Sequence, residues 1–269
     1  TGQAGGLAKR LAARQAVVTW GNDPGNPLYK LPPYRYATDR AKRADLFICL
    51  IEAAKDHCVA LGIPEERCSV VLPPLDTELF HPPDRPVTEP VAVFSSPLAS
   101  NKGIDRVLEA WGLVLRKVPD ARLLVMGRGP MEGLVREAAA TSRGAVELLG
   151  PRDRAGVAEV LRQAAVLVTA PRPTAVWNEQ FGLAYVEAMA SGLCVVTTAC
   201  GTNHEAVRPP NVRVADDAGA LAEGLVHFLS NPTVRAEVGA RNREEAVDRF
   251  ERRQQLAKLS DAFGQAGGR

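Results

Sequence analysis

Short runs of β-branched and other apolar residues alternate along the chain with longer segments in which apolar residues recur every three or four positions. The candidate strands are residues 16–20, 46–49, 69–72, 91–95, 122–126, 146–149, 166–169, 194–197 and 212–214. The candidate helices are residues 103–117, 130–141, 157–163, 183–191 and 218–229. Strands separated by helices of this length predict βαβ units and a mostly parallel sheet that is buried on both faces.

Proline marks a boundary between two regions of this pattern. Residues 73–90 show little periodicity and contain Pro73, Pro74, Pro82, Pro83, Pro86 and Pro90. Such a stretch is typical of a stiff interdomain linker. Five or six βα units follow it, whereas only about three precede it. We therefore expect an incomplete Rossmann-like domain over residues 1–83, a complete doubly wound domain over 84–250, and a C-terminal helix and tail over 251–269. The chain begins at Thr1 without an initiator methionine, so a fragment, a cloned piece and a processed product all remain open.

Composition narrows the class of protein. The 269 residues carry a formal net charge of +2, and basic residues alternate with acidic ones, which does not favour nucleic-acid binding. No apolar run approaches the roughly 20 residues that span a bilayer. The five cysteines show no metal-binding spacing, so we expect buried, reduced thiols in a cytoplasmic protein rather than disulfides or a metal site.

The segment from Asn178 to Gly192 carries the most chemistry. A predicted strand ends in a polar loop, and Gly182 lies where that loop becomes a helix. The free amide groups and positive dipole of a helix start suit a phosphate. Ligands of open α/β sheets bind beyond the carboxyl ends of the strands, where this loop must lie. Glu179 precedes the helix and Glu187 lies within it, so both are candidate ligand contacts.

This segment resembles the E-x7-E signature of retaining GT-B glycosyltransferases, most specifically glycosyltransferase family 4. The resemblance implies that Glu179 contacts the transferred sugar and that Glu187 contacts the ribose hydroxyls. It also implies that the diphosphate meets the backbone of Phe181, Gly182 and Leu183. Cys194 stands where the family usually has proline, a minor departure.

Flanking segments resemble the same family in the same order. Residues 70–82 resemble its interdomain segment, and residues 43–48 and 61–64 resemble the last βα unit of its acceptor domain. Residues 125–130 match a strand that ends in Gly-x-Gly-Pro, which places Gly127 at the donor site. The resemblance enters the family pattern partway through the N-terminal domain. It therefore implies a GT-B fold with a doubly wound C-terminal domain and only part of the Rossmann-like acceptor-side domain.

Lys102 opens the first helix after the proline-rich stretch, where the family carries a phosphate-binding lysine. A lysine at a helix start opposes the dipole, so an anion explains it better than helix stability does. Pro97, however, stands at the customary position of an arginine and cannot neutralise a diphosphate. We expect Arg172, or the hydroxyls of Ser95 and Ser96, to take its place.

Taken as implied by the resemblance, the reaction transfers a hexose from a nucleoside-diphosphate sugar to a hydroxyl acceptor with retention. No cofactor and no obligatory metal ion is expected beside the nucleotide sugar. The acceptor, whether a saccharide, a lipid-linked molecule or a small molecule, stays open, as does contact with a membrane surface. Candidate acceptor-side residues are Trp20, Asn22 and Asn26.

Two other functions compete. A non-catalytic nucleotide-sugar-binding protein derived from a glycosyltransferase would explain both Pro97 and the missing strands. A nicotinamide oxidoreductase would use the glycine-rich turn at residues 127–133, although this turn has the spacing G-x-G-x-x-x-G and is equally typical of a tight βα connection. Finally, we expect Asp216 and Asp217 to cap a helix rather than bind a metal ion.

Overall fold

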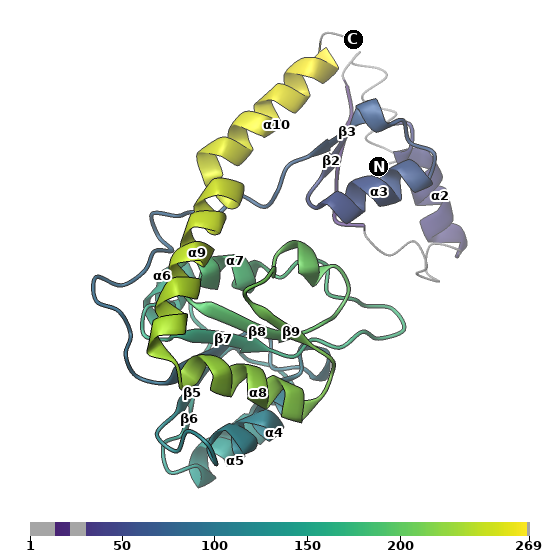
Figure 1. Cartoon of the computed structure of the whole chain (residues 1–269). Coiled ribbons are helices and arrows are strands. Elements are labelled where there is room, and N and C mark those ends of the chain that lie inside the picture. Colours follow the sequence, from purple (N-terminus) through teal and green to yellow (C-terminus); the bar gives the residue numbers. More distant parts are fainter. Residues whose placement is uncertain (1–13, 22–30, 268–269) are drawn as a thin grey trace. The chain divides into compact units, whose positions relative to one another are not determined.

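The computed structural model describes residues 14–21 and 31–267, and Figure 1 shows its helices and strands. By their internal contacts the residues fall into two compact units. The first unit comprises Thr1–Pro74, Thr174–Gln180 and Arg252–Arg269, and the second comprises Leu75–Pro173 and Phe181–Glu251. The N-terminal segment of the first unit ends at Pro74, within the proline-rich stretch. The same unit also includes the C-terminal helix.

The second unit is built on a six-stranded parallel sheet with the strand order β6-β5-β4-β7-β8-β9. Its strands are β4 (Val91–Ser95), β5 (Arg122–Met126), β6 (Val146–Gly150), β7 (Val166–Thr169), β8 (Cys194–Thr198) and β9 (Val212–Val214). The chain builds one half of the sheet outward from β4 and then the other half outward from β7. This is the doubly wound order, and its topological switch point lies between β4 and β7.

Helices connect most of the strands of this sheet, and two more helices follow its last strand. They are α4 (Ile104–Val114), α5 (Glu132–Thr141), α6 (Arg154–Leu161), α7 (Leu183–Ala190), α8 (Ala218–Leu229) and α9 (Pro232–Phe250). Because the sheet is covered on both faces, β4, β7 and β8 are almost continuously apolar and buried. The apolar periodicity of the predicted helix at residues 103–117 is confirmed in α4, since Ile104, Val107 and Trp111 are buried in the core.

The first unit contains a three-stranded parallel sheet, in the order β1-β2-β3, within its described residues. These strands are β1 (Ala16–Thr19), β2 (Leu46–Cys49) and β3 (Cys68–Val70). The helices of this unit are α2 (Pro32–Ala41), α3 (Glu52–Ala60) and α10 (Arg252–Gly267). Leu46 and Ile48 of β2 pack with Ala262 of α10 in a small core.

The expected α/β architecture with parallel sheets is confirmed. The predicted strands agree with the observed ones to within one or two residues at each end, because apolar runs between loop residues are short and distinct. The predicted range of β3, residues 69–72, lies slightly C-terminal to the observed strand Cys68–Val70, because pairing with β2 begins at Cys68. No helix in the described ranges is both long and apolar enough to cross a membrane.

Candidate functional site

The carboxyl ends of β4 and β7 bring several predicted site residues to one edge of the second unit. Ser95 is the last residue of β4, and Ser96 follows it. Lys102 lies in a short 3₁₀ turn, η3 (Ser100–Lys102), in the connection from β4 to α4. Arg172 lies in the loop after β7, the strand that pairs with β4. Since the switch point of a doubly wound sheet opens between such strands, these residues surround the place where the fold binds ligands.

The turn that carries Lys102 lies directly against the end of β7. Gly103 adopts a left-handed conformation with φ +72°, and a Cβ atom there would lie 1.8 Å from the carbonyl oxygen of Ala170. The amide of Arg172 also donates a hydrogen bond of 3.0 Å to the carbonyl of Asn101. Only glycine permits this approach, so Gly103 fixes the position of half-buried Lys102 at the switch point.

The glycines after β5 make room for the loop that follows β4. A Cβ atom at Gly127 would lie 2.2 Å from the carbonyl oxygen of Ser96, and one at Gly129 would lie 2.5 Å from that of Leu98. The amide of Leu98 donates to the carbonyl of Arg128 at 3.0 Å. The backbone of the loop after β4 thus fills the space directly beside these two glycines. This packing argues against the nicotinamide alternative at residues 127–133, and a donor contact at Gly127 stays a prediction.

Arg172 is engaged with the protein rather than directed freely into solvent. Its guanidinium forms an ion pair with Asp105 in the first turn of α4. Its Nε atom donates to the carbonyl oxygen of Ser100 at 3.2 Å. Arg172 therefore ties the Lys102 turn to the loop after β7, and the remaining guanidinium N–H groups are the ones that a phosphate could use. Asp105 was not predicted, because nothing in the periodicity of α4 distinguishes it from another solvent-facing acid.

The helix α7 starts where the sequence predicts it, and anion binding at this start stays a prediction. Gly182 is the N-cap residue and has φ +84°, and the helix begins at Leu183, as predicted. The side chain of Phe181 is buried against Phe250, with ring centroids 5.6 Å apart in an edge-to-face arrangement. The backbone of residues 181–183 thereby turns from loop to helix at a fixed point. The amide groups at this helix start carry the positive end of the helix dipole.

Glu187 lies in α7 in a largely buried position. Burial raises the pKa of its carboxyl to about 7, and the positive charge of Arg154 opposes this rise. Arg154, at the start of α6, places its guanidinium 4.0 Å from the Glu187 carboxylate. Because the arginine side chain is 62% exposed, this pair is too weakly held to cancel the cost of burial. Sequence reasoning missed Arg154, since an exposed arginine in a first helical turn gives no signal of its own.

Glu179 lies in the loop between β7 and α7, in the segment Thr174–Gln180 of the first unit. This loop has its own internal bonds. The amide of Thr174 donates to the carbonyl of Trp177 at 2.8 Å, and the Thr174 hydroxyl accepts from the Trp177 amide at 3.0 Å. Glu179 is half-buried. Its contact with the transferred sugar stays a prediction.

Three buried hydroxyl groups join the first turn of α7 to the strands β7 and β8. Thr169 ends β7, Thr197 lies in β8, and Tyr185 lies in the first turn of α7. Each hydroxyl lies 3.0–3.1 Å from the other two. This hydroxyl triangle fixes the helix start to both strands. Polar residues at the end of otherwise apolar strands were the signal that could have indicated it.

The remaining predictions have separate outcomes. Asp217 caps α8 by accepting from the amide of Ala220 at 2.7 Å, so the capping role is confirmed for this residue. Asp216 is different, because it pairs with Arg106 at 3.0 Å. Asn22 and Asn26 lie outside the described residues, and Trp20 follows β1.

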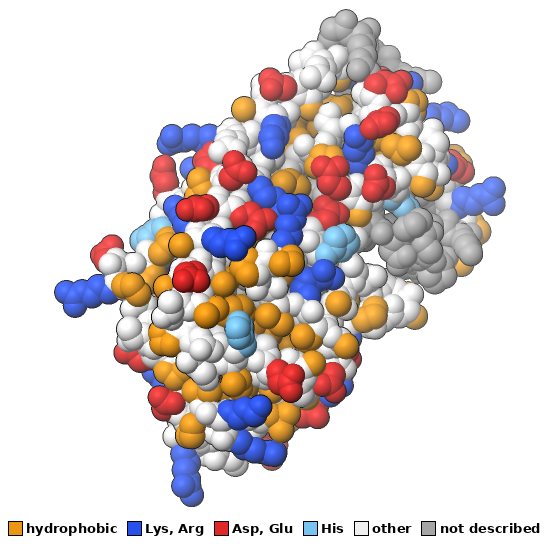
Figure 2. All heavy atoms as spheres, viewed as in Figure 1, with side chains coloured by type: hydrophobic (Ala, Val, Ile, Leu, Met, Phe, Trp, Pro, Cys, Tyr) orange, Lys and Arg blue, Asp and Glu red, His pale blue; other side chains and the backbone are white. Residues whose placement is uncertain are grey.

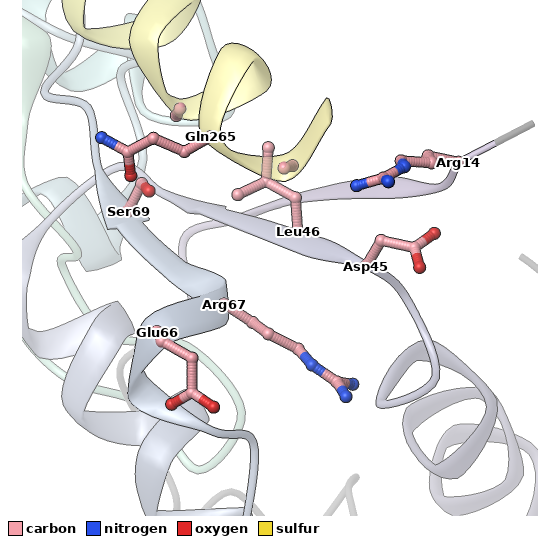
Figure 3. A pocket seen from close by; sticks show the side chains of 9 residues that line it. Arg14, Asp45, Leu46, Glu66, Arg67, Ser69 and Gln265 are labelled. Atoms are coloured by element: carbon pink, nitrogen blue, oxygen red, sulfur yellow. The ribbon is translucent and has the colours of Figure 1, made fainter. Parts of the chain in front are cut away.

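Each unit contains a cavity that lies away from the predicted donor-site residues. One of about 430 Å³ lies in the first unit, at the amino ends of β2 and β3. Figure 3 shows Ser69 and Gln265 on one side of it and Arg14 and Asp45 on the other. Another, of about 500 Å³, lies between the proline-rich segment and α9 in the second unit. None of the predicted donor-site residues lines either cavity, so the candidate site is an edge formed by loops.

On the face in Figure 2, basic and acidic side chains of the described residues are interspersed. That face therefore presents no extended patch of one charge. The expectation that the protein does not bind nucleic acid stays a prediction.

Comparison with known proteins gives a consistent picture. The family described as "Glycosyl transferases group 1" matches residues 89–231. A GDP-mannose-dependent alpha-(1-6)-phosphatidylinositol monomannoside mannosyltransferase of Mycolicibacterium smegmatis is 27% identical over 96% of this chain and 72% of its own length. A D-inositol 3-phosphate glycosyltransferase of Mycobacterium tuberculosis is 31% identical over 81% of this chain. The match spans only 47% of that relative's length.

A solved structure supports the fold. The HepE protein of Anabaena in complex with UDP superimposes with a TM-score of 0.80, covering 97% of this chain and 75% of that one at 18% identity. The architecture is thus the GT-B type of α/β fold, in agreement with the parallel sheets of both units. Incompleteness of the N-terminal domain stays a prediction.

Proposed function

Because the chain belongs to the glycosyl transferases group 1 family, we propose that it transfers a hexose from a nucleoside-diphosphate sugar to a hydroxyl acceptor. We further propose that the anomeric configuration is retained. One observation carries the proposal: the Lys102 turn and the start of α7 both follow strands that flank the switch point of the second unit. This edge offers a cation and the positive end of a helix dipole to a diphosphate.

In the proposed reaction, the bond between the anomeric carbon and the diphosphate oxygen breaks, and a bond from the acceptor oxygen to that carbon forms. Lys102 and the amides at residues 181–183 stabilise the negative charge on the departing diphosphate. Glu179 orients the sugar. The acceptor attacks from the face that the diphosphate leaves, and the acceptor proton passes to the departing phosphate oxygen. No side chain of this site is assigned as a covalent nucleophile.

The donor base is not fixed by the resemblance. A relative in sequence is named for GDP-mannose, whereas a neighbour in structure was solved with UDP. The acceptors named for the relatives include phosphatidylinositol mannoside and inositol phosphate. A lipid-linked, saccharide or small-molecule hydroxyl is accordingly the proposed acceptor class. A cytoplasmic location, with or without contact at a membrane surface, is part of the same proposal.

Calorimetric titration of the purified chain with UDP, GDP, ADP and their sugar conjugates, with and without magnesium, tests the donor site. Selective binding of one nucleotide that does not depend on magnesium is the expected result. Glu187→Ala should weaken binding by roughly 10- to 100-fold, because a charge-assisted hydrogen-bond set to the ribose is lost. Glu223→Ala, an exposed residue of α8, is the matched control. Unchanged affinity in Glu187→Ala would show that the ribose contact is misassigned.

Arg172 supplies a second test of the same site. Arg172→Ala should cost about 1.5–3 kcal/mol of nucleotide affinity, the usual magnitude for a charged hydrogen bond. Asp105→Asn keeps the arginine but removes its ion-pair partner, and it should cost less. If Arg172→Ala binds nucleotide as tightly as the unchanged chain does, Arg172 does not take the role of the arginine that the family carries at the position of Pro97.

Pro97 favours a second candidate, a nucleotide-sugar-binding protein without transferase activity. This candidate predicts selective nucleotide binding but no release of free nucleoside diphosphate from the sugar conjugate, with or without acceptors. Chromatographic detection of the released nucleotide separates the two proposals.

A further inference from the structure

Three of the five cysteines of the chain converge in the first unit. Cys49 ends β2, Cys58 lies in α3, and Cys68 begins β3. Their sulfur atoms all lie within 4.8 Å of one another, and all three residues are buried. Across residues 14–21 and 31–267, no other group of three histidine, cysteine, aspartate or glutamate side chains meets this distance. We refer to these residues as the thiol cluster.

Sheet register and helix placement explain the convergence. In the parallel pair of β2 and β3, Cys68 lies opposite Phe47, and Val70 lies opposite Cys49. Side chains alternate between the faces of a sheet, so Phe47, Cys49 and Cys68 share one face. Leu46 and Ile48 point to the other face, where they pack with Ala262 of α10. The helix α3 supplies Cys58 to the cysteine face.

The donor set is made of sulfur alone. Thiolate ligands select soft ions such as copper(I), zinc and iron in clusters. A structural zinc ion almost always has four ligands. The thiol cluster has three, and its burial leaves little room for water as a fourth, because Cys49, Cys58 and Cys68 are 0%, 4% and 8% exposed. We propose that Cys49, Cys58 and Cys68 bind one copper(I) ion as a three-coordinate, all-sulfur site.

The distances suit this ion with little rearrangement. Metal–thiolate bonds near 2.3 Å in a trigonal plane require sulfur atoms roughly 4 Å apart. The sulfur atoms therefore need to approach by less than about 1 Å from their present limit of 4.8 Å. Rotation about the side-chain bonds can supply such a shift without movement of the strands.

The thiols already interact with one another and with a nearby cation. A hydrogen bond between Cys49 and Cys58 raises the pKa of the former and lowers that of the latter. Burial raises the pKa of the Cys68 thiol, and the positive charge of Lys55 opposes this rise. Lys55 lies one turn before Cys58 in α3 and pairs with Glu65 at 2.8 Å.

The two other cysteines of the chain are internal controls. Cys194 and Cys200 are also buried, but they lie in the second unit and outside the thiol cluster. A role of cysteine as a small apolar residue would apply equally to all five. Metal binding would depend only on the cluster.

The test is a competition experiment on the full chain, reduced and held under nitrogen. Copper(I) is supplied as its bicinchoninate complex, whose colour fades when the protein takes the ion. We expect the unchanged chain to withdraw one equivalent of copper(I). Cys58→Ser should bind at least 10-fold more weakly, whereas Cys200→Ser should bind as the unchanged chain does. X-ray absorption of the loaded protein should show sulfur neighbours only.

Several outcomes would overturn the proposal. They are no uptake by the unchanged chain, equal uptake by Cys58→Ser, or a disulfide among the cluster cysteines in place of metal binding, detected by mass spectrometry. If Cys58→Ser does not fold, Cys68→Ser, at the edge of the cluster, gives the same comparison. The readout is metal binding, so it does not depend on the proposed transferase activity.

Discussion

At the scale of single residues, burial changes the charge state of Glu187, the proposed ribose contact. Its ordinary pKa of 4.5 is raised to about 7 because burial disfavours the charged carboxylate. The folded protein therefore keeps a proton on this group at pH values where the unfolded chain has lost it. It follows that the group lowers folding stability as pH rises from about 4.5 to about 7.

This shift predicts a pH dependence of nucleotide binding. The ionised carboxylate is the better acceptor for ribose hydroxyls, so affinity should rise several-fold between pH 6 and pH 8. Glu187→Gln should abolish the part of this rise that comes from the carboxylate, while titration of the nucleotide phosphate remains in both proteins. Calorimetry at three pH values measures the difference. Parallel affinity profiles for the two proteins would contradict the assignment.

The same substitution should affect stability in the opposite direction. At pH 8, Glu187→Gln should raise the free energy of unfolding by about 1–3 kcal/mol, since an ionised group is no longer buried. At pH 4.5 the two proteins should be nearly equally stable. Urea unfolding at both pH values checks this expectation. A Gln variant that is less stable at pH 8 would show that Arg154 compensates the charge in full.

At the scale of elements, the βα connections determine where the site residues lie. Gly103 allows the turn after β4 to contact the backbone that follows β7. Gly182 allows the backbone at the start of α7 to pack directly against the Tyr185 ring. A Cβ atom at Gly182 would lie 2.3 Å from the Tyr185 ring. These glycines could be predicted as turn residues. The close approach of Gly103 to Ala170 could not, because Ala170 follows a different strand, β7.

Gly103→Ala tests the Lys102 turn. The substitution places a methyl group against the Ala170 carbonyl and forces a left-handed conformation on alanine, so the turn must move. We expect a loss of about 2–4 kcal/mol in stability, together with weaker nucleotide binding. Gly112→Ala is the matched control, because a Cβ atom in that part of α4 meets nothing within 4 Å. It should be neutral or stabilise by up to about 1 kcal/mol. Equal melting temperatures for the two variants would contradict this account.

Tyr185→Phe tests the hydroxyl triangle. The variant keeps the buried ring but removes the group that bonds to Thr169 and Thr197, which can still bond to each other. Stability should fall by about 1–2 kcal/mol, the value of one or two buried hydrogen bonds. Tyr36→Phe, where the side chain is 64% exposed, should change stability by less than about 0.5 kcal/mol. Thermal unfolding of both variants makes the comparison, and a neutral Tyr185→Phe would show that the triangle does not hold α7.

At the scale of the whole molecule, the proline-rich stretch is more firmly held than a linker needs to be. Arg243 of α9 donates to the carbonyl oxygens of Thr77, Phe80 and Ala190, at 3.1, 2.7 and 3.0 Å. Arg235 of the same helix donates to the carbonyl of Thr88 at 2.7 Å. Residues 75–90 therefore belong to the second unit and are held to α9 by two arginines, although their sequence favours a stiff spacer.

Arg243→Ala should loosen this attachment. Three carbonyl groups would lose a charged donor, so we expect a loss of about 2–4 kcal/mol in the free energy of unfolding. Arg241→Ala, at an exposed position of α9, is the control and should have little effect. Limited proteolysis between residues 77 and 90 gives a second measure. Equal cleavage of the unchanged chain and Arg243→Ala would show that Arg243 does not hold the stretch in place.

The sequence by itself determined the order of strands, the parallel sheets and the position of the turn into α7. These features depend on local patterns: apolar runs, helical periodicity and glycines where the backbone must turn. Only the tertiary structure decided the pairing of Arg172 with Asp105, the burial of Glu187 beside Arg154, and the hydroxyl triangle. The convergence of Cys49, Cys58 and Cys68 belongs with these, since their spacing along the chain fits no metal motif. Such contacts join residues from different elements, and strand register and helix packing, rather than sequence spacing, bring them together.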